Sequence, residues 1–185
     1  MVERWECISP DDYTRIISIY HYLESLSNEY PHFEQWYFGK VIPQLKLSKR
    51  MIKYLSIDEK IAGLIILKNT EDEKKISTLR VSPEFQGRGI GQSLLNWARF
   101  SLHCTSPLVT VPQVHYEAFA KLFEKNGFIL CKEYHDYYKR GSIEFSYNGC
   151  LTAPKVRFLV QNERLYSYIH KAGICGSDSK WSKNG

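Results

Sequence analysis

Hydrophobic residues in the first part of the chain recur with the period of a helix. The first apolar set repeats every three or four positions and comprises Ile16, Ile19, Tyr20, Leu23 and Leu26. This spacing predicts an amphipathic helix over residues 10–27, with Ser9 capping its N-terminus and Pro10 in its first turn. Residues 5–8, just before the helix, predict a short strand.

A second helical stretch, residues 32–45, is rich in aromatic side chains. Its apolar set comprises Phe33, Trp36, Tyr37, Phe38 and Val41. Gly39 and Pro43 interrupt the stretch, so the form of its later part stays open. The rings either pack on the core or line a pocket, and both alternatives fit the pattern.

From residue 51 onward the period changes to the alternation of apolar and polar residues that is typical of strands. Three consecutive strands, joined by short charged turns, are predicted at residues 51–57, 61–68 and 76–81. Because short turns connect antiparallel neighbours, we expect these strands to form an antiparallel run.

Helices and strands alternate in the following part of the chain. A helix is predicted at residues 89–103, a buried strand at 108–111 and a second helix at 113–125. Two final strands, at 128–134 and 142–147, are expected to pair with each other. This order of elements predicts a fold of the α/β (α+β) class.

Composition narrows the kind of protein further. Of the 185 residues, 43% are hydrophobic and 14% aromatic, which is enough to bury a core and argues against disorder. No apolar run is long enough to cross a bilayer, and the first residues lack the pattern of a signal peptide. The five cysteines are scattered and odd in number, and none belongs to a metal-ligand pattern. We therefore expect a cytoplasmic protein without a membrane partner or a bound metal.

Positive charge is concentrated at the end of the chain. Residues 151–185 carry +4 of the net charge of +5, because six Lys and Arg residues stand there against two acidic residues. A strand over residues 156–160 and a short helix over 161–171 are predicted in this segment. The segment is compatible with RNA or an acidic partner, and also with an added edge strand and a solvated end, which we favour.

Residues 86–91, Gln-Gly-Arg-Gly-Ile-Gly, form a glycine-rich loop between a predicted strand and a predicted helix. Glycines permit positive φ and close approach of the backbone, and the first N–H groups of a helix are unpaired. Together with Arg88 and the helix dipole, these groups favour a bound anion. The loop is not a P-loop, because no Lys-Ser or Lys-Thr follows its glycines, and it lacks the G-x-G-x-x-G spacing of a dinucleotide-binding fingerprint.

The same loop fits another pattern, which starts with Gln or Arg, has Gly three residues later and has Gly or Ala five residues later. Gln86, Gly89 and Gly91 occupy these three positions. The loop also follows a strand that ends at Val81, two residues before Pro83. In this combination it resembles the pyrophosphate-binding segment of the GNAT superfamily, the N-acetyltransferases that use acetyl-CoA.

A second stretch strengthens the resemblance. The helix predicted at residues 113–125 is followed by Asn126, Gly127 and Phe128, and this arrangement resembles the later motif of the family. The two motifs have the order and separation of the family, and together they cover residues 74–134, about a third of the chain.

The resemblance implies a GNAT fold, with a mixed and mostly antiparallel sheet of six to seven strands flanked by about four helices. The acetyltransferase domain is expected at residues 1–150, followed by a basic C-terminal extension at residues 151–185.

The cofactor implied by the resemblance is acetyl-CoA. The residues expected to bind it, through the backbone of the strand and of the loop, are Leu79, Arg80, Val81, Gln86, Gly87, Arg88, Gly89, Ile90, Gly91 and Gln92. The strand at residues 79–81 is expected to separate from the strand at 108–111 and so open a slot for the pantetheine arm.

The catalytic groups implied by the resemblance are incomplete in this chain. The amide of Val81 is expected to polarise the thioester carbonyl. Many family members carry a Tyr that protonates the leaving sulfur, but this chain has Phe123 at that position, and a phenyl ring has no proton to give. Tyr116, two helical turns earlier on the same face, is the candidate substitute. Other candidate donors are Tyr134, Tyr137, Tyr138, His115 and solvent, and the general base is unassigned.

Three functions stay open at this point. The first is an acetyl-CoA-dependent N-acetyltransferase in which a primary amine attacks directly in a ternary complex; Phe33, Trp36 and Tyr37 would line its acceptor pocket. The acceptor would be a small molecule, a peptide or a protein Lys, and the enzyme a monomer or homodimer. The second is acetylation of aminoacyl-tRNA, as in toxin-like relatives, and the third a CoA-binding regulatory module with weak or lost catalysis.

Overall fold

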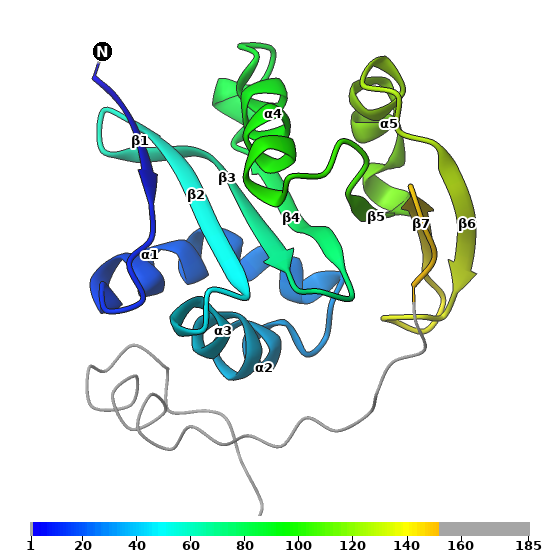
Figure 1. Ribbon diagram of the computed structural model, residues 1–185, viewed down its shortest axis with the longest axis horizontal. Coiled ribbons are helices and arrows are strands. Elements are labelled where there is room, and N and C mark those ends of the chain that lie inside the picture. Colours follow the sequence, from blue (N-terminus) through cyan, green and yellow to red (C-terminus); the bar gives the residue numbers. More distant parts are fainter. Residues whose placement is uncertain (1, 152–185) are drawn as a thin grey trace, which may run out of the picture. The chain divides into compact units, whose positions relative to one another are not determined.

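Seven strands form one sheet in the order β1-β2-β3-β4-β5-β7-β6 in the computed structural model, which describes residues 2–151 (Figure 1). All neighbouring strands pair antiparallel except β4 and β5, which are parallel. The expected α/β (α+β) class with a mixed, mostly antiparallel sheet is therefore confirmed. The division of the chain at residue 150 stays a prediction, and the strand and helix predicted at residues 156–171 lie outside the described residues.

The first four strands form the antiparallel run that the alternating pattern predicts. They are β1 (Glu3–Cys7), β2 (Arg50–Ile57), β3 (Lys60–Asn69) and β4 (Lys74–Val81). β3 is buried along most of its length because strands flank it on both edges and helices cover its faces. The continuous apolar run at residues 61–67 reflects this position.

The first helix starts later than its sequence pattern predicts. α1 covers Tyr13–Leu23 and continues into a 3₁₀ turn, η1, at Glu24–Asn28. The expectation that Ser9 caps the helix is wrong, because the N–H of Asp12 donates to the carbonyl of Ser9 in a preceding turn. Asp12 is the cap instead, and its side chain accepts from the N–H of Arg15 at 2.9 Å.

The aromatic stretch is helical throughout, with one wide turn. α2 (Phe33–Trp36), the π-helical segment η2 (Tyr37–Val41) and α3 (Ile42–Lys46) follow one another without a break. Gly39 lies within the π segment, and Pro43 lies in the first turn of α3, where a missing backbone N–H costs little.

The second half of the chain alternates helices and strands as predicted. After the 3₁₀ turn η3 (Pro83–Phe85), its elements are α4 (Ile90–Leu102), β5 (Leu108–Pro112), η4 (Gln113–His115), α5 (Tyr116–Lys125), β6 (Leu130–His135) and β7 (Ile143–Tyr147). β6 begins later than expected, because Phe128 still belongs to the end of α5. Its N–H donates to the carbonyl of Phe123 after Gly127 takes a φ of 69°.

Helices cover both faces of the sheet. Figure 1 shows α4 and α5 on one face and α1 to α3 on the other. Alternation along β7 therefore separates its side chains: Phe145 and Tyr147 pack toward α5, while Glu144 points to the opposite face, where it meets Tyr30. Within residues 2–151 no helix has the length and apolar character needed to cross a membrane.

Candidate active site

The parallel strands β4 and β5 pair at only two positions and then separate. Lys75 pairs with Leu108 and Ile76 with Val109, and the described ladder ends there although β4 continues to Val81. The expected opening between the two strands is thus confirmed. A cavity with about 470 Å³ of empty space, part of it open to solvent, occupies the gap. It is lined by Leu26, Tyr30, Ile76, Ser77, Thr78, Leu79, Val109, Thr110, Val111, Pro112, His115, Phe119 and Phe123.

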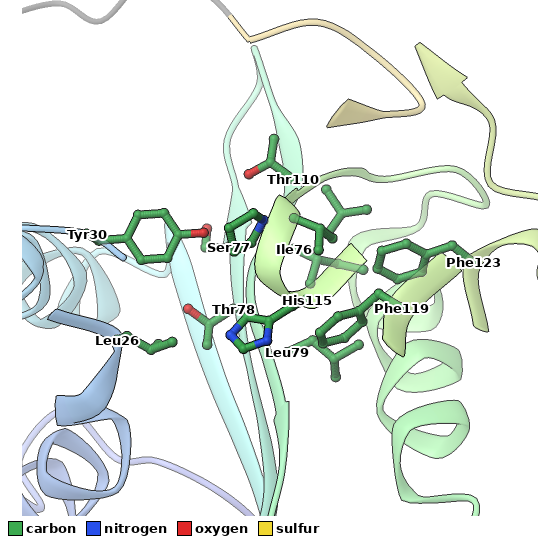
Figure 2. Close-up of a pocket in the computed structure, with 13 residues that line it drawn as sticks. Leu26, Tyr30, Ile76, Ser77, Thr78, Leu79, Thr110, His115, Phe119 and Phe123 are labelled. Atoms are coloured by element: carbon green, nitrogen blue, oxygen red, sulfur yellow. The ribbon is translucent and has the colours of Figure 1, made fainter. Parts of the chain in front are cut away.

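The cavity has a polar side and an apolar side (Figure 2). Figure 2 shows Tyr30 and Thr78 on one side and Phe119 and Phe123 on the other, with His115 between them. The polar side is formed by the segment after η1 and by β4, and the apolar side by α5. A molecule in this cavity would meet hydroxyl groups at one side and aromatic rings at the other.

The glycine-rich loop has the backbone conformation of an anion-binding loop. Gly87 and Gly89 have φ of 75° and 78°, which a side chain would strain, and Gly89 is the N-cap residue of α4. The first turn of α4 leaves its N–H groups unpaired by the helix itself. Gln86 closes the loop toward the strand, since its Nε2 donates to the carbonyl oxygen of Val81 at 3.3 Å.

Two of the residues expected to bind the cofactor through their backbones have side chains that are engaged elsewhere. Arg80 donates to Ser25 Oγ at 2.8 Å and covers the ring of Tyr22, on the face of α1. Gln92 pairs through its amide with Asn126 at 2.8 and 2.9 Å, which ties α4 to the end of α5. Any role of these two residues in cofactor binding therefore falls to their backbones. Arg88 is exposed beside the loop, over the ring of Phe85.

The backbone at the end of β4 directs one amide toward the gap. The N–H of Ser82 donates to the carbonyl of Ala62 in β3 at 2.9 Å. Successive residues of a strand direct their N–H groups to opposite edges, so the N–H of Val81 is directed to the β5 side. The N–H of Val81 therefore lies on the β5 edge of β4, and its role as an oxyanion donor stays a prediction.

Comparison with known families agrees with this geometry. Residues 52–130 match the family model described as "Acetyltransferase (GNAT) domain". These residues are similar to a GNAT acetyltransferase domain. The matched segment runs from β2 to the start of β6 and so includes β4, the glycine-rich loop, α4 and β5.

Solved structures with the GNAT fold cover most of the chain. An acetyltransferase of the GNAT family from Desulfovibrio desulfuricans is 13% identical, with a TM-score of 0.59 over 79% of this chain and 97% of that one. The ribosomal-protein-S18-alanine N-acetyltransferase of Escherichia coli is 18% identical, with a TM-score of 0.55 over 85% and 100%. PaiA N-acetyltransferase from Thermoplasma acidophilum, solved with coenzyme A, is 18% identical, with a TM-score of 0.54 over 79% and 98%. No curated protein sequence matches the chain.

The candidate proton donor, Tyr116, lies outside the cavity. Tyr116 packs its ring on Phe145, with 4.4 Å between the ring centroids, and lines a separate depression in the surface. Its hydroxyl is hydrogen-bonded to Tyr147, and burial together with this bond raises the pKa of Tyr147 to about 12. Phe123 lines the cavity, with its ring stacked on Phe119.

The aromatic residues expected at the acceptor pocket belong to a buried cluster. Phe33 and Tyr37 are stacked 6.1 Å apart and are 3% and 0% exposed, and the hydroxyl of Tyr37 donates to the carbonyl of Ile16. Trp36 is partly exposed and lies under the guanidinium of Arg50. None of the three lines the described cavity, so their role at the acceptor stays a prediction.

The structure adds a residue that sequence reasoning missed. Glu144 is 3% exposed and accepts hydrogen bonds from Tyr30, at 3.2 Å, and from Thr110. Burial raises its pKa to about 7 in spite of these bonds and of the nearby Lys75. In the sequence Glu144 is an ordinary polar position of an alternating strand. No sequence signal distinguishes it, because its environment is formed by Tyr30 and β5.

His115 has a partner at the mouth of the cavity. Its Nε2 lies 3.6 Å from Oε1 of Glu29, which belongs to the segment after η1. The other carboxylate oxygen of Glu29 is buried and has no hydrogen-bond partner among the described residues. Sequence reasoning named His115 among several possible proton donors, and the structure places it in the cavity lining.

Proposed function

We propose that this protein is an acetyl-CoA-dependent N-acetyltransferase that acetylates a primary amine. The observation that carries the proposal is the separation of β4 from β5 directly before the glycine-rich loop, which leaves a cavity open beside a free strand edge. Two structural neighbours support it. The protein from E. coli is a ribosomal-protein-S18-alanine N-acetyltransferase, and the N-acetyltransferase from T. acidophilum was solved with coenzyme A.

The groups present fit the donor substrate. The loop offers backbone N–H groups at the start of α4, two glycines with positive φ and the exposed cation of Arg88, which together suit a pyrophosphate. Beyond Ile76 the edge of β4 that faces β5 is free of ladder bonds in the described residues, so it can accept an extended amide-containing arm. Leu79 lines the cavity beside that edge.

The chain supplies orientation and one oxyanion donor to the reaction. Acetyl-CoA supplies an acetyl thioester; attack of the amine nitrogen on its carbonyl carbon forms the C–N bond, breaks the C–S bond and releases the CoA thiolate. The N–H of Val81, on the β5 edge of β4, would stabilise the negative charge that develops on the carbonyl oxygen. The hydroxyl groups on the polar side would receive the acceptor, whether a small molecule, a peptide or a protein Lys.

A CoA-binding module without strong catalysis is the second candidate. The observation that favours it is Phe123, a fully buried ring where many family members have a proton-donating Tyr. Acetylation of aminoacyl-tRNA is supported only by the basic segment at residues 151–185. Most of that segment lies outside the described residues. Charged tRNA is therefore included only as one of the acceptors to be tested.

Release of CoA thiol from acetyl-CoA tests the proposal. The acceptors are a peptide with a free α-amino group, an N-terminally blocked Lys peptide, a diamine and charged tRNA. We expect turnover with at least one amine, and tight CoA binding without turnover on any acceptor would favour the module instead.

Two glycine variants locate the donor site in the same experiment. Gly89→Glu places a side chain and a negative charge in the loop, so it should abolish CoA binding measured by calorimetry. Gly141→Glu is the matched control, because Gly141 also has positive φ, 76°, and open space around it but lies between β6 and β7. Retained CoA binding by the Gly89 variant would contradict the assignment of the loop.

A further inference from the structure

A hydroxyl in the cavity is connected to a carboxyl group in the protein interior. Tyr30 lines the polar side of the cavity, and its hydroxyl donates to Oε1 of Glu144 at 3.2 Å. Glu144 is only 3% exposed and is absent from the cavity lining. Glu144 therefore reaches a molecule in the cavity only through hydroxyl groups that line it, those of Tyr30 and Thr110.

The surroundings of Glu144 do not resemble those of a structural ion pair. The described residues around its charge include Tyr30 and Thr110, which donate to it, Lys75, which attracts it, and Glu29, which repels it. The ring hydroxyl of Tyr138 is also within electrostatic range of Glu144. Within residues 2–151 no ion pair joins Glu144 to Lys75, although Lys75 is near enough to lower the pKa of Glu144. Burying a carboxylate costs folding free energy unless hydrogen bonds and opposite charges offset the loss of its hydration. Carboxyl groups buried without such full compensation occur preferentially at functional sites.

We propose that Tyr30 and Glu144 form the proton relay that deprotonates the attacking amine. This inference rests on the proposed function. As the amine nitrogen bonds to the acetyl carbon, its proton passes to the oxygen of Tyr30, while the proton of Tyr30 passes to the carboxylate of Glu144. Tyr30 ends neutral and Glu144 protonated, and Glu144 then returns the proton to solvent. The CoA thiolate leaves with the electron pair of the broken C–S bond.

The pKa values of Tyr30 and Glu144 favour a relay over a mechanism in which ionised Tyr30 itself acts as the base. Burial raises the pKa of Tyr30 well above its ordinary value, and Glu144 and Tyr138, whose ring packs on Tyr30 at 5.2 Å, raise it further. Tyr30 therefore stays protonated near neutral pH and accepts a proton only by giving up its own. Burial raises the pKa of Glu144 to about 7, which is close to the value at which a base is both available and effective.

Two neighbouring groups are less suited to the role. Lys75 is partly buried and burial lowers its pKa to about 8, so it is still mostly a cation near neutral pH and it lies outside the cavity lining. Glu29 faces His115 at 3.6 Å and is not among the cavity residues. Tyr30 and Thr110 both line the cavity and both hydrogen-bond to Glu144. Of the two, the phenol of Tyr30 is the more acidic hydroxyl, so it is the better suited to pass its proton on.

The pH dependence of kcat/KM tests the relay, with the best amine of the acceptor panel as substrate. The variants are Tyr30→Phe, which removes one oxygen, and Glu144→Gln, which keeps the shape of the side chain. Their matched controls are Tyr54→Phe and Glu6→Gln. Tyr54 also donates to a carboxylate, Glu6 Oε2 at 2.5 Å, but that pair joins β2 to β1 away from the cavity.

We expect kcat/KM of the wild type to fall as the pH is lowered through about 7, because Glu144 then becomes protonated. Both relay variants should lose about 100-fold or more in kcat and lose this limb of the profile, with KM for acetyl-CoA unchanged. The control variants should keep the rate and the profile of the wild type.

The outcomes separate the relay from the proposed function. The relay alone is overturned if the wild type is active but Tyr30→Phe and Glu144→Gln keep the fall of kcat/KM near pH 7. It is also overturned if these variants have the same rate as their controls. A limb that is lost in Glu29→Gln but kept in Glu144→Gln overturns it in favour of Glu29. A wild type that acetylates no amine overturns the proposed function, and the relay falls with it. If Glu144→Gln does not fold, Tyr30→Phe decides the question.

Discussion

Phe123 and His115 illustrate how single residues shape the chemistry available in the cavity. Phe123 is fully buried and stacked against Phe119 and Phe128, so it contributes packing and no proton. His115 lines the same cavity and carries ring nitrogens that can donate, with Glu29 beside it. The position that many family members use for a proton donor is therefore a packing position here, and His115 is one of the cavity residues able to donate.

We expect His115→Asn to lower kcat more than Tyr116→Phe does. A donor to the leaving sulfur must lie in the cavity, and loss of such a group costs about 10- to 100-fold or more in rate. Tyr116 was the donor expected from the sequence, but its hydroxyl is bonded to Tyr147 outside the cavity. Steady-state kinetics with the best amine measure both effects. A large loss of kcat in Tyr116→Phe with little loss in His115→Asn would restore the role of Tyr116.

At the scale of elements, a close contact with β3 fixes the position of helix α4. A Cβ atom at Gly63 would lie 2.8 Å from Ile90 Cγ2 and 3.2 Å from the carbonyl oxygen of Arg80. Glycine at this position therefore lets the first turn of α4 approach the sheet, and with it the glycine-rich loop. On another side of the helix, Gln92 and Arg99 of α4 hydrogen-bond to Asn126, the residue that ends α5.

Gly63→Ala should destabilise the protein by overpacking this contact. We expect the free energy of unfolding to fall by about 1–3 kcal/mol, measured by urea denaturation. Gly39→Ala is the matched control, because no atom lies within 4 Å of a Cβ at Gly39. Because Gly39 lies in a helical turn, its replacement should leave the stability unchanged or raise it by up to about 1 kcal/mol. Equal stability of both variants and the wild type would mean that α4 can shift without cost.

At the scale of the whole molecule, the fold forces a carboxyl group into its interior. Glu144 reaches its buried position because β7 inserts between β5 and β6, so that the residue is covered by Tyr30 on one side and bonded to Thr110 on the other. Such a residue couples the stability of the entire domain to pH.

The stability difference between Glu144→Gln and the wild type should depend on pH. The folded state raises the pKa of Glu144 from 4.5 to about 7, so it holds a proton that the unfolded chain has lost in this window. Wild-type stability should therefore fall as pH rises from about 4.5 to about 7, and the glutamine variant lacks this loss.

Between pH 4.5 and 7 the wild type should lose about 3 kcal/mol of unfolding free energy relative to Glu144→Gln. Urea denaturation at several pH values measures it. Glu133→Gln, which removes an exposed carboxyl group on β6, is the control. A difference for Glu144→Gln that is independent of pH would contradict the raised pKa.

Local patterns in the sequence were sufficient for most elements and for the donor loop. The periods of apolar residues identify the strands and helices, since burial of one face imposes that period. The spacing of Gln86, Gly89 and Gly91 identifies the loop, because positive φ and a helix start are local backbone requirements. Local patterns erred at boundaries such as the cap of α1, where Asp12 and Ser9 are both suitable residues and tertiary context selects one.

The chemistry of the acceptor side was decided only by the tertiary structure. Tyr30, Thr110 and Glu144 are far apart in the sequence and none belongs to a motif, so their hydrogen bonds arise from the order of the strands. The sequence by itself determined the strands, the helices and the anion-binding loop, because these depend on neighbouring residues. The tertiary structure alone decided which carboxyl group is buried and which hydroxyl faces the cavity, because burial and proton affinity depend on residues brought together from distant segments.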